Sequence, residues 1–148
     1  MRKLIWLIVI VLVVIGIYKW TAKNDDTTGT VAESFAATMN PVANSGVTGT
    51  ATIEEGTGGL VVSIALAGAL PEIGNHPAHV HMGTCTAPGN VKFALTDVVD
   101  GISRTEVTGM TLQDITDGIA NGGLSVNVHM SADDLGNYLA CGNIEDAP

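Results

Sequence analysis

Between residues 34 and 148 the sequence repeats one pattern, in which short runs of β-branched and apolar residues are separated by Gly, Pro and Asn. Residues 46–54 show it clearly, because threonines alternate there with smaller or apolar side chains, the period of a half-buried strand. The segment 55–59, Glu-Gly-Thr-Gly-Gly, is typical of a hairpin turn. The pattern predicts strands over residues 34–39, 46–54, 60–67, 78–82, 91–98, 104–107, 124–130 and 139–144.

One segment departs from this pattern. Leu112, Ile115 and Ile119 have helical spacing, and Asn-Gly-Gly at 121–123 is a stop signal, which predicts a short helix over residues 111–120. Eight short strands with glycine-rich turns predict an all-β domain over residues 34–148, folded as an antiparallel sandwich or Greek-key barrel.

The N-terminus carries an unbroken apolar run over residues 4–18, flanked on both sides by the basic residues Arg2, Lys3, Lys19 and Lys23. The run is shorter than the roughly 20 residues that span a bilayer, but Tyr18 and Trp20 suit the interface and lengthen it. A cleaved signal peptide fits the basic start equally well, although Tyr18 and Trp20 are bulky for a cleavage site. We therefore expect one N-terminal transmembrane helix, an uncleaved membrane anchor over residues 1–23, then a polar linker over 24–33 and an extracytoplasmic domain.

The charge is unevenly distributed along the chain. Beyond residue 23 only Lys92 and Arg104 stand against fifteen acidic residues, which gives that part a net charge of −13. A surface this acidic repels nucleic acid, so we expect no nucleic-acid partner, and it also disfavours anionic substrates.

Cys85 and Cys141 are the two cysteines of the chain. In a cytosolic protein they would be read as free thiols. Behind a membrane-targeting segment, a single structural disulfide is the favoured interpretation.

The four histidines are His76, His79, His81 and His129. His79 and His81 are two residues apart, so on a strand they share one face and both rings can reach one metal ion. His129 lies in a second strand-like run and offers a third imidazole, a good ligand for copper or zinc. The alternative is that His76 and His129 satisfy buried backbone groups and the pair is incidental. Spacing alone leaves both open.

Two segments resemble Cu/Zn superoxide dismutases. His-Pro-Ala-His-Val-His at 76–81 is similar to the family's His-Gly-Phe-His-Val-His, and Val-His followed by Asp-Asp-Leu-Gly and Leu-Ala-Cys-Gly, within 128–142, is similar to its late signature. The resemblance covers roughly Gly46 to Ile144 and implies a Greek-key barrel of the Cu/Zn superoxide dismutase type. It also implies three roles: copper ligation by His79, His81 and His129, bracing of the copper loop by His76, and a Cys85–Cys141 disulfide.

The departures from that family are as informative. No histidine lies between His81 and His129, so the bridging ligand and the zinc ligands are missing, and we expect copper without zinc. Tyr138 stands where the family has its active-site arginine, and the loop that steers substrate is cut short.

A second resemblance is to the chordin-type (CHRD) domain, whose Tyr-Val-Asn-Val-His strand is similar to residues 125–129 and whose short helix is similar to 112–123. Three functions therefore stay open: weak superoxide dismutase activity, a copper-binding module, and a metal-free binding or scaffold domain. Met82 and Met130 each follow a candidate ligand directly, and we expect them to face away from it into the core.

Overall fold

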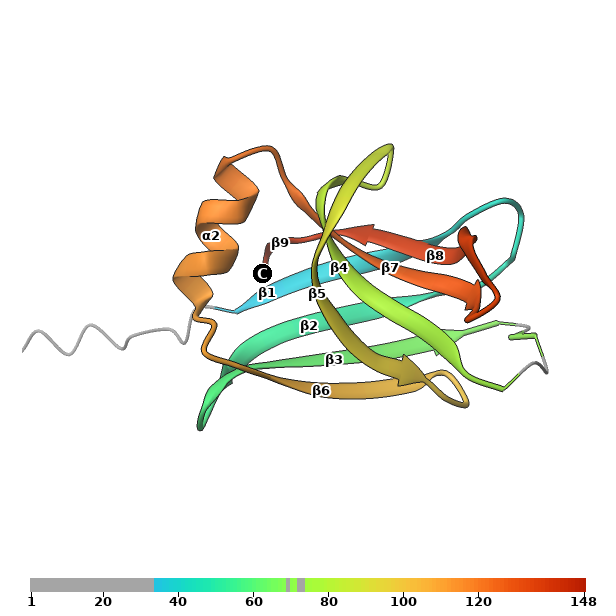
Figure 1. The fold of residues 1–148 in the computed structure, drawn as a ribbon, viewed down its shortest axis with the longest axis horizontal. Coiled ribbons are helices and arrows are strands. Elements are labelled where there is room, and N and C mark those ends of the chain that lie inside the picture. The colour runs from blue at the N-terminus through green and yellow to red at the C-terminus, as the bar shows by residue number, and fades with distance from the viewer. Residues whose placement is uncertain (1–33, 69, 72–73) are drawn as a thin grey trace, which may run out of the picture. The chain divides into compact units, whose positions relative to one another are not determined.

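The structure, a computed structural model, describes residues 34–148 apart from residues 69, 72 and 73 (Figure 1). The predicted anchor and linker, residues 1–23 and 24–33, lie outside the described residues. In the described part of the chain, no helix has the length and apolar character needed to cross a membrane.

The eight predicted strands and the predicted helix are all present, and most strands extend beyond their predicted ends (Figure 1). A two-residue strand, β9, was not predicted, and β8 begins ahead of its predicted start at residue 139. The elements are β1 (Phe35–Pro41), β2 (Thr48–Gly56), β3 (Gly59–Ala67), β4 (His76–Thr84), β5 (Ala87–Val98), β6 (Ile102–Thr108), α2 (Leu112–Ala120), β7 (Leu124–Ser131), β8 (Asp134–Asn143) and β9 (Glu145–Asp146).

The strands form one antiparallel sheet in the order β5-β4-β7-β8-β1-β2-β3-β6, and β9 pairs with β1. The sheet has two halves, β5-β4-β7-β8 and β2-β3-β6, and strand β1 joins them. Its first part pairs with β2, and its end, at Asn40 and Pro41, pairs with β8. The connections from β3 to β4 and from β6 to β7 cross between the halves, which is the Greek-key pattern.

Side chains close the remaining seam between β5 and β6, the two ends of this strand order. The Ser103 hydroxyl donates to the Thr96 carbonyl at 2.6 Å, and the Thr96 N–H donates to Thr105 Oγ1 at 2.7 Å. The sheet therefore curls into a nearly closed barrel, which confirms the predicted all-β fold (Figure 1).

The hydrophobic core lies inside this barrel. On β2, for example, Ala51 and Ile53 are buried while Thr52 between them is not, as the sequence alternation predicts. Helix α2 begins at the N-cap Thr111, which forms a capping box with Asp114, and it buries Leu112 and Ile115 against the core.

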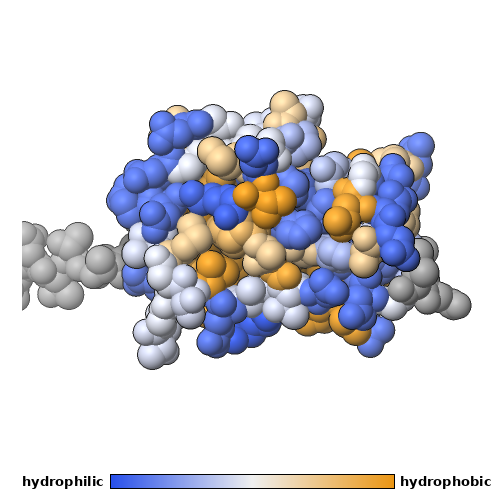
Figure 2. All heavy atoms as spheres, in the orientation of Figure 1, coloured by the Kyte–Doolittle hydropathy of each residue, from blue (hydrophilic) through white to orange (hydrophobic). Residues whose placement is uncertain are grey.

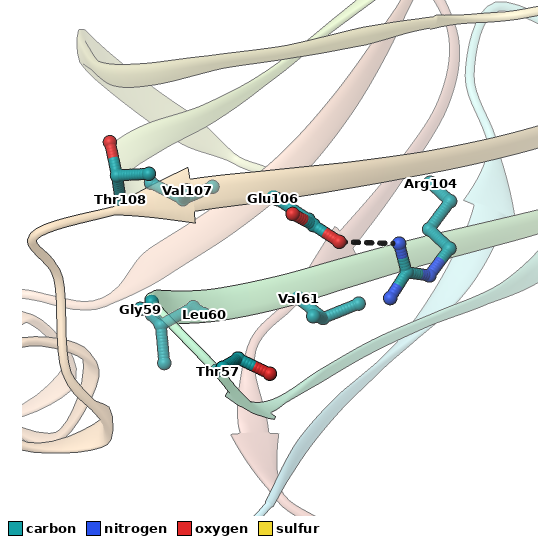
Figure 3. A pocket seen from close by; sticks show the side chains of 9 residues that line it. Thr57, Gly59, Leu60, Val61, Arg104, Glu106, Val107 and Thr108 are labelled. Atoms are coloured by element: carbon teal, nitrogen blue, oxygen red, sulfur yellow. Dashed lines mark hydrogen bonds and ion pairs between the residues drawn. The ribbon is translucent and has the colours of Figure 1, made fainter.

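The surface carries some apolar groups, and Figure 2 shows them in the middle of the face seen in Figure 1, with hydrophilic residues around them. A small pocket of about 100 Å³ lies where the β2–β3 turn meets β6 and includes the Arg104–Glu106 ion pair (Figure 3). Its lining contains no histidine or cysteine, so it offers no nitrogen or sulfur ligand for a metal ion.

Candidate metal centre

Strand β4 carries two kinds of residue on its two faces. Ala78 and Val80 are buried in the core, whereas His79 and His81 lie on the opposite, outer face of the barrel wall. This is the arrangement predicted for a His-x-His pair on a strand, and it separates the histidines from the hydrophobic core.

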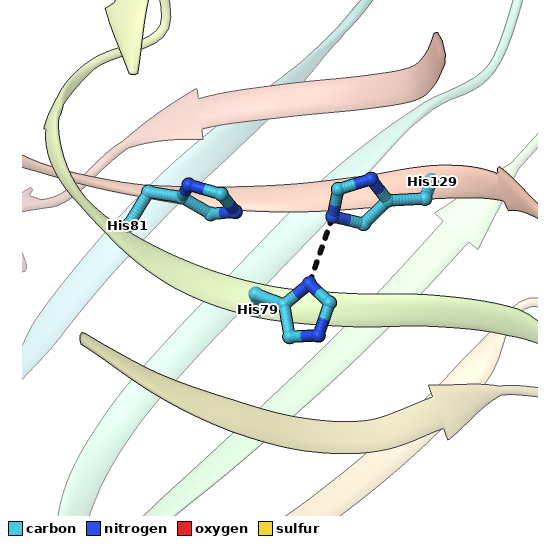
Figure 4. A group of neighbouring side chains, drawn as sticks. All are labelled: His79, His81 and His129. Atoms are coloured by element: carbon cyan, nitrogen blue, oxygen red, sulfur yellow. Dashed lines mark hydrogen bonds between the residues drawn. The ribbon is translucent and has the colours of Figure 1, made fainter. Parts of the chain in front are cut away.

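Strand β7 brings the third histidine beside this pair. It runs antiparallel to β4, with Ala78 opposite Val128, so His129 also lies on the outer face, next to His79 (Figure 4). One ring nitrogen from each of His79, His81 and His129 lies within 4.8 Å of the others. The structure therefore brings together the three residues that the sequence offered as metal ligands.

Backbone carbonyls hold two of these rings. The Nδ1–H of His81 donates to the Gly89 carbonyl at 2.9 Å, and the Nδ1–H of His129 donates to the Leu135 carbonyl at 2.7 Å. Each bond fixes the tautomer in which Nε2 carries a free lone pair, the form that a metal ion requires. The Nε2 atom of His81 is buried and has no hydrogen-bond partner among the residues that the structure describes.

The His79 ring is held by the His129 ring. Because His129 uses its proton on Leu135, its Nε2 is an acceptor, and His79 donates its Nδ1–H to it at 2.8 Å (Figure 4). With metal–nitrogen bonds near 2.0 Å, two ligands at a right angle lie about 2.8 Å apart and two opposite ligands about 4 Å apart. The two nitrogens of the His79–His129 pair already lie at a distance that fits one ion. The largest nitrogen–nitrogen separation in the group must shorten by roughly 1 Å.

Burial favours the neutral form of two of the imidazoles. It lowers the pKa of His129, an effect that the Leu135 carbonyl partly opposes, and it lowers the pKa of His79, with a further contribution from His81. Asp97 acts in the other direction on the pKa of His79. Neutral rings are what metal binding needs, so the environment prepares the site for a cation.

His76 is not a member of this group. It is buried and donates its Nδ1–H to the Met130 carbonyl at 2.8 Å, one residue beyond His129. It therefore ties β4 to the segment of β7 that carries a candidate ligand. The bracing role expected of it stays a prediction.

Cys85 and Cys141 form a disulfide, as predicted. The Cys85 N–H also donates to Asn143 Oδ1 at 2.8 Å. Both contacts attach the β4–β5 turn to β8. That turn leads directly to Gly89, whose carbonyl holds His81, so the disulfide constrains the segment on which the orientation of His81 depends.

The register places two further residues at the site, of which the resemblance had indicated only Tyr138, at the position of the family's active-site arginine. Tyr138 lies opposite His129 in the β7–β8 register, with its ring centroid 4.8 Å from that of His129 and 6.3 Å from that of His81. It thus forms an aromatic wall beside two candidate ligands. Asn127 is buried on the same outer face, and the only sequence signal for it is a polar residue inside an apolar strand.

The prediction that Met82 faces the core is wrong, because its side chain is 48% exposed. Register irregularities in the pairing of β4 with β5 lie on both sides of this residue, between Val80 and Gly83, so strict alternation does not carry the Met82 side chain into the core.

The barrel, the disulfide and the histidine group together define a protein with the superoxide dismutase fold. The sequence matches no protein-family model and no curated protein. Among solved structures, the chain is similar to superoxide dismutase 5 of Candida albicans in its Cu(II) form, with 24% identity and a TM-score of 0.55 over 80% of this chain and 94% of that one. A point mutant of the same enzyme gives 23% identity and a TM-score of 0.58 over 78% of this chain and 93% of that one.

Proposed function

We propose that the β-domain binds one copper ion through His79 Nδ1, His81 Nε2 and His129 Nε2. The observation that carries this proposal is the convergence of three imidazole nitrogens, two of them on rings whose other nitrogen is held by a backbone carbonyl. The buried, unpartnered Nε2 of His81 supports it further, because a buried acceptor without a donor is costly unless a cation meets it.

Copper is favoured over other metals for two reasons. Imidazole is a good copper ligand, and a structurally similar protein is a superoxide dismutase solved with Cu(II). The absence of any histidine between His81 and His129 argues against a neighbouring zinc ion held as in the Cu/Zn family. When bound, copper would supply one-electron redox chemistry at a coordination position that the three histidines leave open.

Weak superoxide dismutase activity is compatible with this site, but fast activity is not expected. The net charge of −13 beyond residue 23 repels an anion, and Arg104 is paired with Glu106 at 3.0 Å. Tyr138, an uncharged residue, lies beside His129. We therefore propose copper binding as the primary function and superoxide dismutation as a secondary, slow activity.

The proposed location is the extracytoplasmic side of a membrane, with residues 1–23 as the anchor. The apolar run at 4–18 and its basic flanks support an anchor. The Cys85–Cys141 disulfide supports an oxidising compartment, because such bonds are rare in the cytosol.

A metal-free scaffold of the chordin type is the alternative. The hydrogen bond between His79 and His129 favours it, because these two rings satisfy each other without an ion. It leaves the buried His81 Nε2 unexplained.

Metal analysis separates the two proposals. The purified full-length chain is stripped with a chelator, exposed to copper and zinc in equal amounts, desalted and measured for both metals. We expect one copper per chain, no zinc, and a Cu(II) electron paramagnetic resonance spectrum with nitrogen couplings. A His79→Ala, His129→Ala double variant is the control and should retain none. A wild-type chain that retains no metal would leave the scaffold proposal in place.

A further inference from the structure

Asn127 occupies the centre of the outer face that carries the histidines. On β7 it alternates with Ser125 and His129, so all three side chains lie on that face. In the register its partners are His79 on β4 and Cys141 on β8. Asn127 is only 1% exposed, and its amide is therefore enclosed between candidate metal ligands and the disulfide.

The amide of Asn127 is only half satisfied. Its Nδ2 donates to Ser125 Oγ at 3.4 Å, a long contact, whereas no donor in the described part of the chain reaches its buried Oδ1. Leaving a buried carbonyl oxygen unpaired is costly, so native proteins supply such an atom with a donor. The described residues supply no donor for Oδ1, which leaves this position to a bound molecule.

A second unpartnered atom lies on the same face. It is His81 Nε2, and Ser125, whose hydroxyl accepts from Asn127 Nδ2, is the residue opposite His81 in the β4–β7 register. Both atoms are acceptors, since His81 uses its Nδ1–H on Gly89. A metal ion with an O–H-bearing ligand satisfies such a pair, because the nitrogen binds the ion and the oxygen accepts from the ligand's hydroxyl.

We propose that Asn127 is a positioning residue of this site, whose Oδ1 accepts a hydrogen bond from the small neutral molecule that completes the coordination of the metal. This inference rests on the proposed copper site and specifies which ligands it takes: water and small neutral O–H donors, such as hydrogen peroxide. The superoxide anion has no O–H to donate. This preference for neutral ligands agrees with the net charge of −13 that the chain carries beyond residue 23.

The test uses the full-length chain loaded with Cu(II), with water as the probe. Electron-nuclear double resonance in H₂O and D₂O measures the couplings of exchangeable protons to the copper. Asn127→Leu removes the acceptor at nearly constant size, Asn127→Asp retains it, and Asn127→Ala serves if the leucine variant does not fold. Asn40→Leu is the matched control, since Asn40 is exposed and lies two strands away, opposite Cys141 on β8.

We expect a sharp exchangeable-proton coupling in wild type, Asn127→Asp and Asn40→Leu. In Asn127→Leu it should broaden or vanish, while the copper dissociation constant rises by no more than about tenfold, the lower end of the range for residues around metal ligands. A leucine variant with the wild-type coupling would overturn this inference and leave the copper site standing. A wild-type chain that binds no copper would overturn both.

Discussion

His79 donates its Nδ1–H to Nε2 of His129 at 2.8 Å, so two of the three proposed metal ligands are hydrogen-bonded to each other. Metal binding must therefore replace this hydrogen bond and move the remaining proton of His79 to its Nε2. Both rings stay neutral in this exchange, and no charged residue has to be displaced. The metal-free and metal-loaded forms would then differ chiefly in one tautomer and a small shift of the rings.

The first prediction compares two histidines of β4. His81→Ala should abolish tight copper binding, because it removes a ligand, whereas His76→Ala should weaken it by about 10- to 100-fold, because it frees the Met130 carbonyl next to His129. Competition with a chelator of known affinity measures both dissociation constants. Equal losses in the two variants would show that His76 binds the metal directly or that both variants unfold, and far-ultraviolet circular dichroism separates those cases.

The second prediction concerns pH and the metal-free chain. Burial lowers the pKa values of His79 and His129 below the roughly 6.5 of an unfolded chain, so the unfolded state takes up protons first as the pH falls. These two groups should therefore leave stability unchanged above about pH 6.5. They should lower the free energy of unfolding as the pH falls from about 6.5 toward the folded pKa values, below which the loss levels off.

Denaturant unfolding at several pH values between 7.5 and 5 measures this effect, with a His79→Gln, His129→Gln double variant as the control. The loss of stability on acidification should be larger in wild type than in the variant. Parallel curves for the two proteins would refute the assignment.

A third prediction addresses the disulfide. Cys85 and Cys141 are 56 residues apart, and closing a loop of that size stabilises a chain by about 4 kcal/mol in the chain-entropy account, less any strain. Cys141→Ser should lower the midpoint of denaturant unfolding under oxidising conditions. The same wild-type protein treated with a reductant should show a similar loss. Two thiols that react with an alkylating reagent in the native, unreduced protein would contradict the bond.

A fourth prediction concerns Tyr138. Replacing it by Arg places a cation beside His129 and should raise the rate at which the copper-loaded chain consumes superoxide, by about tenfold or more at low ionic strength. Added salt should reduce the gain. Tyr138→Leu is the control, since it removes the ring without adding charge. If both variants change the rate equally, the effect comes from access to the site and not from charge.

The last prediction concerns the apolar run at residues 4–18. The full-length chain should sediment with membranes and resist carbonate extraction, because a hydrophobic segment with basic flanks inserts stably. A chain that begins at residue 34 is the control and should remain in the supernatant. A mature N-terminus downstream of Trp20 would instead identify a cleaved signal peptide.

The sequence predicted most of the fold, because the signals for it are local. Alternation marked strands such as β2, and the helical spacing of Leu112, Ile115 and Ile119 marked α2. Strand ends were less accurate, and β9 was missed, since two residues carry no periodicity. Met82 was misplaced, because irregular pairing between neighbouring strands leaves no trace in a single strand's pattern.

The candidate site was predicted in part. The spacing of His79 and His81 placed both on one face, but only the strand order brings His129 next to them. The carbonyls of Gly89 and Leu135, which set two tautomers, are backbone groups, so side-chain identity gives no hint of them. Asn127 became a site residue only through the cross-strand register, whereas the resemblance had already indicated Tyr138.

The core residues and the candidate ligands of β4 lie on opposite faces of the strand, and this has a consequence for how such domains evolve. Ala78 and Val80 serve the core while His79 and His81 between them serve the outer face, so selection can act on the two sets independently. A lineage could lose its imidazoles and retain the same barrel, or regain them by two or three point mutations. Shared ancestry would then identify the barrel in a relative, and only the residues at these outward positions would tell whether that relative handles a metal.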